Sequence, residues 1–310
     1  MYNSTEMIGE RNMLEISAAC FELADIPKYH QAGIRTVLFS LPFFSARPAG
    51  VFTNEQINEG TRQLHQLGMK SAVQLTRFFT ESECEACREE LAILKEINVD
   101  AIYFTDCAVL QLADELNMKE KLIYNPDTLI TNACDAQFYL DQGIQCVTLS
   151  KEITKEEMIQ IAKHVHGRLE VIIHGRLNMM HSKRTLLTSY FEFLGKDTTP
   201  ARDHGLYLME ETRDEHMPII EDELGTHVFT GFTLCSFNEI CELKDAGITD
   251  MRIESLFLTC DQVCQIAMDY QDVLAGRKQG QELFDQYQKE YPTQNISTGF
   301  MYKKTSTVKV

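Results

Sequence analysis

Residues 35–75 read RTVLFSLPFFSARPAGVFTNEQINEGTRQLHQLGMKSAVQL and contain the pattern that decides the fold. A β-branched and aromatic run at 35–40 predicts a strand, and a second run at 70–75 predicts another. The segment 54–67 between them has apolar residues at helical spacing and ends at Gly68, a residue that favours the backbone conformation found after a helix. The order strand, helix, glycine, strand is typical of a βα unit with parallel strands.

The same unit recurs along most of the chain. Further strands are expected at 14–17, 100–105, 121–124, 145–149, 169–174 and 250–254. Further helices are expected at 80–97, 131–142, 154–166, 238–246, 260–274 and 279–290. The first seven strands begin roughly 20–35 residues apart, which is the spacing of parallel strands joined by helices. Eight such strands predict an α/β fold, a (β/α)8 TIM-barrel-like domain.

The eighth strand arrives late, so we expect a small β-containing insertion before it. Residues 1–190 are assigned to barrel strands 1–7, and residues 191–249 to the inserted small β subdomain. Residues 250–292 then supply the last barrel strand and the C-terminal helices, and residues 293–310 form a polar tail.

Composition limits the function. The 310 residues contain 29 Lys and Arg against 46 Asp and Glu, a formal net charge of −17, which disfavours binding of a nucleic-acid backbone by this chain alone. No signal peptide and no apolar run long enough to span a membrane is visible, so we expect a cytoplasmic protein without a membrane partner. The 10 cysteines are then expected to be reduced thiols rather than a disulfide framework.

Two cysteine pairs have helical spacing, Cys84 with Cys87 and Cys260 with Cys264. A zinc site needs a second C-x-x-C pair, which the sequence lacks. Small buried or half-exposed thiols without a function are the simpler interpretation of both pairs.

Polar residues follow seven of the predicted strands, and in a barrel the carboxyl ends of the strands form the active-site face. They are Ser40, Thr76-Arg77, Thr105-Asp106, Asn125-Pro126-Asp127, Ser150-Lys151, His174-Gly175 and Glu254-Ser255. Polar turn residues commonly end strands, but seven together favour a polar mouth. Lys151 is a candidate ligand-binding residue there, and Glu254 a candidate catalytic residue.

The densest group of reactive side chains follows the seventh strand, in residues 170–190. Arg176, Lys183 and Arg184 could hold an anionic ligand there, Arg184 through two parallel hydrogen bonds. His174 and Ser182 are further candidates for ligand binding, and His174 and Arg184 for catalysis. A solvated basic loop before the insertion is the alternative interpretation.

This segment resembles the signature of peptidase family U32, the collagenase-like proteases, whose pattern is E-x-F-V-H-G-A-L-C-x-x-x-S-G-x-C-x-x-S. The matching residues are Glu170, His174, Gly175, Leu177, Ser182, Arg184 and Leu186. Shorter matches occur in family order over most of the chain, at Ala32-Gly33-Ile34, Asp100-Ala101-Ile102-Tyr103, Asp106 with Val109-Leu110, Thr131-Asn132, Asp245-Ala246-Gly247 and Arg252-Ile253-Glu254. The resemblance implies a barrel with an insertion after the signature, as the residue patterns do.

The departures from the family pattern concern its metal centre. Members that hold a 4Fe-4S cluster use four cysteines, and the positions matching three of them carry Asn178, Thr185 and Ala201 here. Only the fourth is kept, as Cys235, and one thiolate cannot hold such a cluster. The family's I-E-G-R after the last strand is also altered, to Ile253-Glu254-Ser255-Leu256. We therefore expect no metal and no cofactor in this chain.

The resemblance also implies a function. Family members not assigned as proteases act in hydroxylation, among them those that modify the wobble uridine of tRNA, with prephenate implied as oxygen source. A chain of this length without cluster ligands is similar to the short member of a pair of paralogues. It is therefore expected to be an accessory subunit that forms a complex with a longer family member carrying the 4Fe-4S cluster. Contact with tRNA is expected through that complex. The alternatives are a U32-type peptidase, with Ser182 or Thr185 as nucleophile and His174 or His181 as base, and a non-catalytic barrel that binds small anions.

Overall fold

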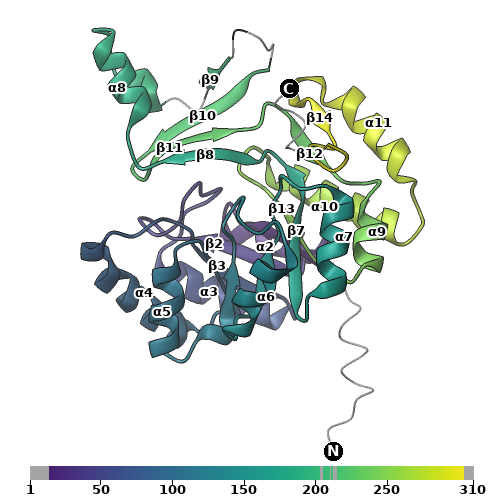
Figure 1. Ribbon diagram of the computed structural model, residues 1–310, viewed down its shortest axis with the longest axis horizontal. Helices are drawn as coiled ribbons and strands as arrows, with labels where there is room; N and C mark the ends of the chain where they lie inside the picture. Colours follow the sequence, from purple (N-terminus) through teal and green to yellow (C-terminus); the bar gives the residue numbers. More distant parts are fainter. Residues whose placement is uncertain (1–13, 203–204, 210, 212–214, 304–310) are drawn as a thin grey trace, which may run out of the picture.

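A closed barrel forms the body of the molecule (Figure 1). The computed structural model describes residues 14–202, 205–209, 211 and 215–303. Within these residues, eight parallel strands close in the order β13, β1, β2, β3, β4, β5, β6, β7, because β13 pairs with both β1 and β7. Their bounds are Glu15–Ala19 (β1), Thr36–Ser40 (β2), Lys70–Leu75 (β3), Ala101–Phe104 (β4), Leu122–Tyr124 (β5), Cys146–Thr148 (β6), Arg168–Gly175 (β7) and Asp250–Ile253 (β13). The predicted (β/α)8 fold is confirmed.

Helices cover the outside of the barrel (Figure 1). They are Ile26–Gln31 (α2), Asn54–Gln66 (α3), Cys84–Ile97 (α4), Cys107–Glu115 (α5), Ala133–Asp141 (α6), Lys155–His164 (α7), Ile240–Asp245 (α9), Cys260–Leu274 (α10) and Gly280–Glu290 (α11). Helix α3 begins where the Thr53 side chain accepts a hydrogen bond from the backbone N–H of Gln56, and Gly68 with φ of 68° follows its end. No described helix has the length and apolar character needed to cross a membrane.

Apolar side chains pack in two places, outside the ring of strands and inside it. Between strands and helices lies one continuous apolar core, which includes Phe39, Val73, Ile102 and Tyr270. The interior holds a smaller apolar layer, formed by Leu38, Ala72, Ala101, Tyr103, Ile123 and Cys146. Next to that layer lie charged groups, which are described with the site below.

The described part of the insertion forms an antiparallel sheet in the order β8, β11, β10, β9, which lies across the carboxyl end of the barrel (Figure 1). Its strands are Asn178–Ser182 (β8), Tyr207–Leu208 (β9), Met217–Asp222 (β10) and Gly225–Phe229 (β11), and the helix Leu186–Phe193 (α8) packs on it through the buried Leu187. The small sheet therefore begins at Asn178 and not at residue 191, because the chain leaves β7 at Gly175 and pairs at once with β11. The boundary between barrel and insertion is corrected accordingly.

Two further strands extend the barrel sheet beside β7. The strand β12 (Thr233–Cys235) pairs antiparallel with β7, so that Cys235 lies opposite His174. The strand β14 (Ile296–Ser297) pairs with β12, and Met301 is buried. The segment expected as a polar tail thus contributes to the fold as far as residue 303, whereas residues 304–310 lie outside the described part.

Short 3-10 helices complete the connections. They are Leu23–Asp25 (η1), Glu81–Glu83 (η2), Lys119–Lys121 (η3), Thr199–Arg202 (η4) and Pro292–Gln294 (η5).

Candidate functional site

A small polar pocket lies at the carboxyl ends of the barrel strands, beneath the inserted sheet. The barrel lines it with residues such as Arg47, Asp127 and Lys151, and the sheet lines it with Asn178 of β8 and Phe229 of β11. Its volume of about 30 Å3 corresponds to about two water molecules. A ring-sized ligand therefore enters this mouth only if side chains or the sheet move.

Asp127 is the centre of the charged groups in the mouth. One carboxylate oxygen lies 2.8 Å from Nζ of Lys151, and the other lies 3.1 Å from a guanidinium nitrogen of Arg47. The amide of Asn178 donates to that second oxygen at 3.2 Å. The carboxylate thus connects the loops after β2, β5 and β6 with the first residue of the small sheet.

Burial alone would raise the pKa of the Asp127 carboxyl, but the positive charges of Arg47, Lys151 and Arg252 outweigh it and hold the pKa below its usual range. Asp127 is therefore ionised at neutral pH. Both Asp127, with φ of 61°, and Arg47, with φ of 57°, have left-handed backbones, which are costly for residues other than glycine. Such strain is concentrated at functional sites, so it supports the mouth as the candidate site.

Below the mouth, a buried ion pair crosses the barrel interior. A guanidinium nitrogen of Arg252 lies 3.2 Å from Glu170, whose carboxylate also accepts hydrogen bonds from Thr148 and Tyr103. Burial raises the pKa of Glu170, and the charge of Arg252 opposes that change. The other terminal nitrogen of Arg252 contacts Glu254 at 3.0 Å, so the interior pair is joined to the rim of the mouth.

The structure places three of the predicted site residues at the mouth. Lys151, Arg176 and Glu254 all line the pocket. Arg184 and Ser182 belong to the end of β8 and the loop after it, and neither lines the pocket. The Ser182 hydroxyl accepts a hydrogen bond from the backbone N–H of Arg184, and among the described residues no histidine is bonded to it.

His174 lies deeper than the sequence suggests. It is only 1% exposed and packs against the rings of Phe237, Tyr270 and Tyr287. Its Nδ1 lies 3.3 Å from the hydroxyl of Tyr270, and burial lowers its pKa to about 3. The ring is therefore neutral at physiological pH and is separated from the mouth by packing.

The small sheet is attached to the barrel by contacts at the end of β8. The His181 ring stacks on Phe78 of the barrel loop after β3. Within the sheet, Nδ1 of His181 lies 3.0 Å from Nδ1 of His227 on β11. Nζ of Lys183 donates to the backbone carbonyl of Phe78 at 2.9 Å. Lys183 thus links the sheet to the barrel.

The four positions that the family resemblance assigns to a cluster do not supply four thiolates. Asn178 offers an amide, Thr185 a hydroxyl and Ala201 a buried methyl group. Cys235 is fully buried, and burial raises the pKa of its thiol, which disfavours the thiolate that a metal requires. These residues do not fit a 4Fe-4S cluster. Among the described residues, no group of three or more His, Cys, Asp or Glu side chains is arranged to hold a metal ion.

The cysteine pairs of helical spacing are free thiols. Burial raises the pKa of Cys87 to about 12, and it also raises the pKa of Cys260 and Cys264. Raised pKa values leave Cys87, Cys260 and Cys264 protonated and unreactive at neutral pH.

One charged residue of the mouth, Arg47, was absent from the sequence-based candidates, and the role of a second, Asp127, was not foreseen. Arg47 follows β2 in a loop with no strand-end signal, and its role depends on folding back over 80 residues to Asp127. Asp127 itself was visible as a polar strand-end residue, but its contacts with Arg47 and Lys151 follow only from barrel closure.

A closed (β/α)8 barrel whose mouth is covered by a small inserted sheet defines the class of this protein. The chain belongs to peptidase family U32, whose family model matches residues 22–309. The predicted family is thereby confirmed.

Three proteins of similar sequence illustrate how relatives of this chain are named. The chain is 28% identical to tRNA hydroxylation protein P2 of Bacillus subtilis over 91% of its own length and 95% of that protein. It is 23% identical to tRNA hydroxylation protein P1 of the same organism, over 72% of its length and 54% of that protein. It is 24% identical to an uncharacterised protease of Methanocaldococcus jannaschii, over 81% of its length and 64% of that protein.

Proposed function

We propose that this chain is an accessory component of a tRNA hydroxylation system and acts with a longer family member that carries the 4Fe-4S cluster. The observation that carries the proposal is the match to tRNA hydroxylation protein P2, which extends over 95% of that protein. The match to protein P1 of the same organism spans 54% of that protein, so P1 has additional length that this chain does not share. The pair of a short and a long relative in one organism supports a division of labour.

The division of labour follows from the residues at the cluster positions. Asn178, Thr185 and Ala201 cannot bind iron as thiolates do, and the thiol of Cys235 is buried and protonated. The redox chemistry of a hydroxylation is therefore assigned to the partner's cluster. This chain contributes binding and positioning.

The mouth is the proposed place for a small carboxylate such as prephenate. Arg47, Lys151 and Arg252 bring three cations to this region, and Asp127, Glu170 and Glu254 balance their charge while the mouth is closed. A ligand carboxylate would use the same cations, because charge-assisted hydrogen bonds to arginine and lysine are strong. The small volume requires that the covering sheet move before such a ligand enters.

The partner is also proposed to supply most of the contacts with tRNA. A chain with a net charge of −17 repels a polyphosphate backbone over most of its surface. The proposed location is the cytoplasm, where such a tRNA-modifying complex would work.

The peptidase alternative has weaker support in the geometry. Ser182 bonds to a backbone N–H, and His174 is buried in an aromatic cluster, so the nucleophile and base that such a mechanism needs are not brought together.

Complex formation tests the proposal. The tagged chain is co-expressed with the longer, cysteine-complete family member of the same genome, and the purified material is analysed by size-exclusion chromatography with light scattering. We expect one species that contains both chains and has the absorbance of an iron–sulfur cluster. Two separate species at micromolar concentration, with the longer protein folded and cluster-loaded, would contradict the proposal.

A further inference from the structure

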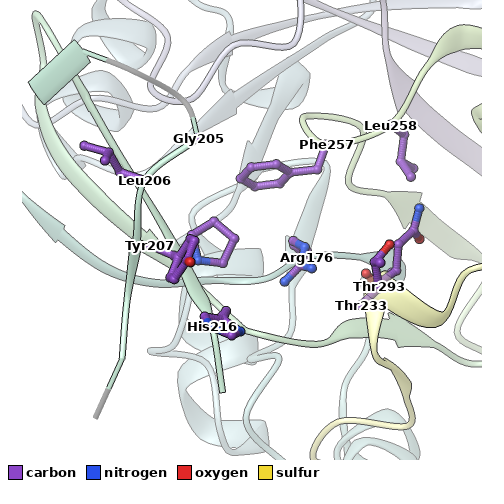
Figure 2. Close-up of a pocket in the computed structure, with 11 residues that line it drawn as sticks. Arg176, Gly205, Leu206, Tyr207, His216, Thr233, Phe257, Leu258 and Thr293 are labelled. Carbon is purple, nitrogen blue, oxygen red and sulfur yellow. The ribbon is translucent and has the colours of Figure 1, made fainter. Parts of the chain in front are cut away.

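A second, larger pocket lies beside the mouth, between the β9–β10 end of the small sheet and the loop after β13 (Figure 2). Its volume is about 330 Å3, at the lower end of the range of about 300–1,000 Å3 typical of ligand pockets. One wall comes from β9 and the start of β10, and the other from the loop after β13 and the segment before β14. We call it the outer groove.

Aromatic rings stand on both walls of the outer groove. Tyr207 and His216 form one wall with their rings edge to face, 4.4 Å apart, and Phe257 stands on the other side (Figure 2). Phe257 is held from behind by Phe229, whose ring lies 4.9 Å away and lines the mouth. The ring pair Phe229 and Phe257 therefore separates the groove from the mouth.

Arg176 lies between these walls and lines both pockets (Figure 2). One of its terminal nitrogens donates to the backbone carbonyl of Thr230 at 2.7 Å, which fixes the guanidinium in place. Burial lowers its pKa, which the negative charge of Glu215 partly offsets, and no described carboxylate forms an ion pair with it. A fixed, partly desolvated guanidinium of this kind is suited to bind an anion.

Small polar groups complete the groove opposite Tyr207. Thr233 of β12 and Thr293 contribute hydroxyl groups to the lining (Figure 2). Gln294 adds an amide. Such groups both donate and accept hydrogen bonds, as the edge of a nucleobase or a ribose requires.

We infer that the outer groove binds one nucleotide of an RNA, with the base against the rings of Tyr207 and Phe257 and the phosphate on Arg176. Base-to-ring stacking and contacts between cations and phosphate are common interactions by which proteins hold single-stranded RNA. An aromatic carboxylate would use the rings and the cation but would leave the hydroxyl and amide groups without partners. The inference rests on the proposed function, because it places the RNA substrate next to the mouth.

The absence of tryptophan from the sequence allows a direct test in the full chain. The variant Tyr207→Trp introduces a single fluorescent reporter into the groove, and the probe is uridine 5′-monophosphate. We expect saturable quenching by the probe, and we expect Arg176→Gln in the same background to weaken binding about tenfold. The matched control Tyr190→Trp, at an exposed position on α8, should show no saturable response.

Two competitors distinguish nucleotide binding from binding of a sugar phosphate or of an aromatic carboxylate. Calorimetry of uridine 5′-monophosphate with the wild-type chain controls for a defect of the tryptophan variant. Ribose 5-phosphate and 4-hydroxybenzoate should each bind at least about tenfold more weakly than the nucleotide. The inference is overturned if wild type and variant both fail to bind the nucleotide, if ribose 5-phosphate binds equally well, or if 4-hydroxybenzoate binds more tightly. Complex formation with the longer family member does not depend on this groove, so either idea can fail alone.

Discussion

Nζ of Lys151 lies 2.8 Å from Oδ1 of Asp127, and the lysine side chain is only 2% exposed at that point. An ammonium group so deeply buried needs a carboxylate partner, because an unpaired buried charge is strongly destabilising. The same carboxylate accepts from Asn178, the first residue of the small sheet. The ion pair therefore links the barrel to its cover.

Replacing the central carboxylate should destabilise the fold. In Asp127→Asn the two cations Arg47 and Lys151 lose their charge partner, and we expect a loss of about 3 kcal/mol in the free energy of unfolding, measured by urea denaturation. The matched control is Asp114→Asn, which breaks an exposed pair with Lys119 and should cost less than about 1 kcal/mol. Equal effects of the two substitutions would contradict the central role of Asp127.

The effect of Asp127 should depend on pH in a defined direction. Its folded-state pKa lies below the unfolded value of about 3.9, so its contribution is complete above that value and is lost as pH falls through the folded pKa. The stability difference between wild type and Asp127→Asn should therefore be the same at pH 7 and pH 5.5 and should shrink below about pH 4. A difference that shrinks between pH 7 and pH 5.5 would show that another group is responsible.

His174 should titrate far below the range of an ordinary histidine. Burial lowers its pKa to about 3, so its imidazole NMR signals should stay constant between about pH 5 and 8. The unfolded chain binds a proton near pH 6.5, so stability should fall as pH falls from about 6.5. His174→Phe identifies the signals by their loss and should remove that part of the pH dependence. A titration of the His174 ring near pH 6.5 would mean that it is exposed and available as a base.

The interior pair of Glu170 and Arg252 should show strong coupling. Each single variant, Glu170→Gln and Arg252→Met, removes one side of the buried ion pair while the other charge stays buried, and should cost about 3–5 kcal/mol. The double variant should be clearly more stable than the sum of the two losses predicts, because it removes both charges. Additive losses in a double-mutant cycle would show that the two groups do not interact.

Iron analysis tests the assignment of the cluster to the partner. The chain purified alone under anaerobic conditions should contain far less than one iron and one sulfide per chain, because Asn178, Thr185 and Ala201 stand where the resemblance places cysteines. About four of each per chain would show that other residues hold a cluster.

The barrel could be predicted from the sequence because its signals are local. Strands such as 70–75 and helices such as 260–274 follow from residue periodicity and from end signals such as Gly68, and the structure has these two elements at the predicted bounds. The start of the small sheet at Asn178 could not be predicted, because β8 is defined by pairing with β11, more than 40 residues later.

The site was only partly predictable for the same reason. Lys151, Arg176 and Glu254 were found because the carboxyl ends of strands meet at one face of a barrel. The depth of His174 and the displacement of Arg184 from the mouth depend on how β7 and β8 leave the barrel, which no local pattern records.

The most direct test of the proposed function is nucleoside mass spectrometry of tRNA from a host that lacks its own tRNA hydroxylation proteins. The host receives this chain, the longer cysteine-complete family member, or both, and the 5-hydroxyuridine content of its tRNA is compared. We expect little modification with this chain alone and a clear increase when it accompanies the longer protein. Equal modification with and without this chain, while both proteins are expressed and folded, would contradict its role as an accessory component.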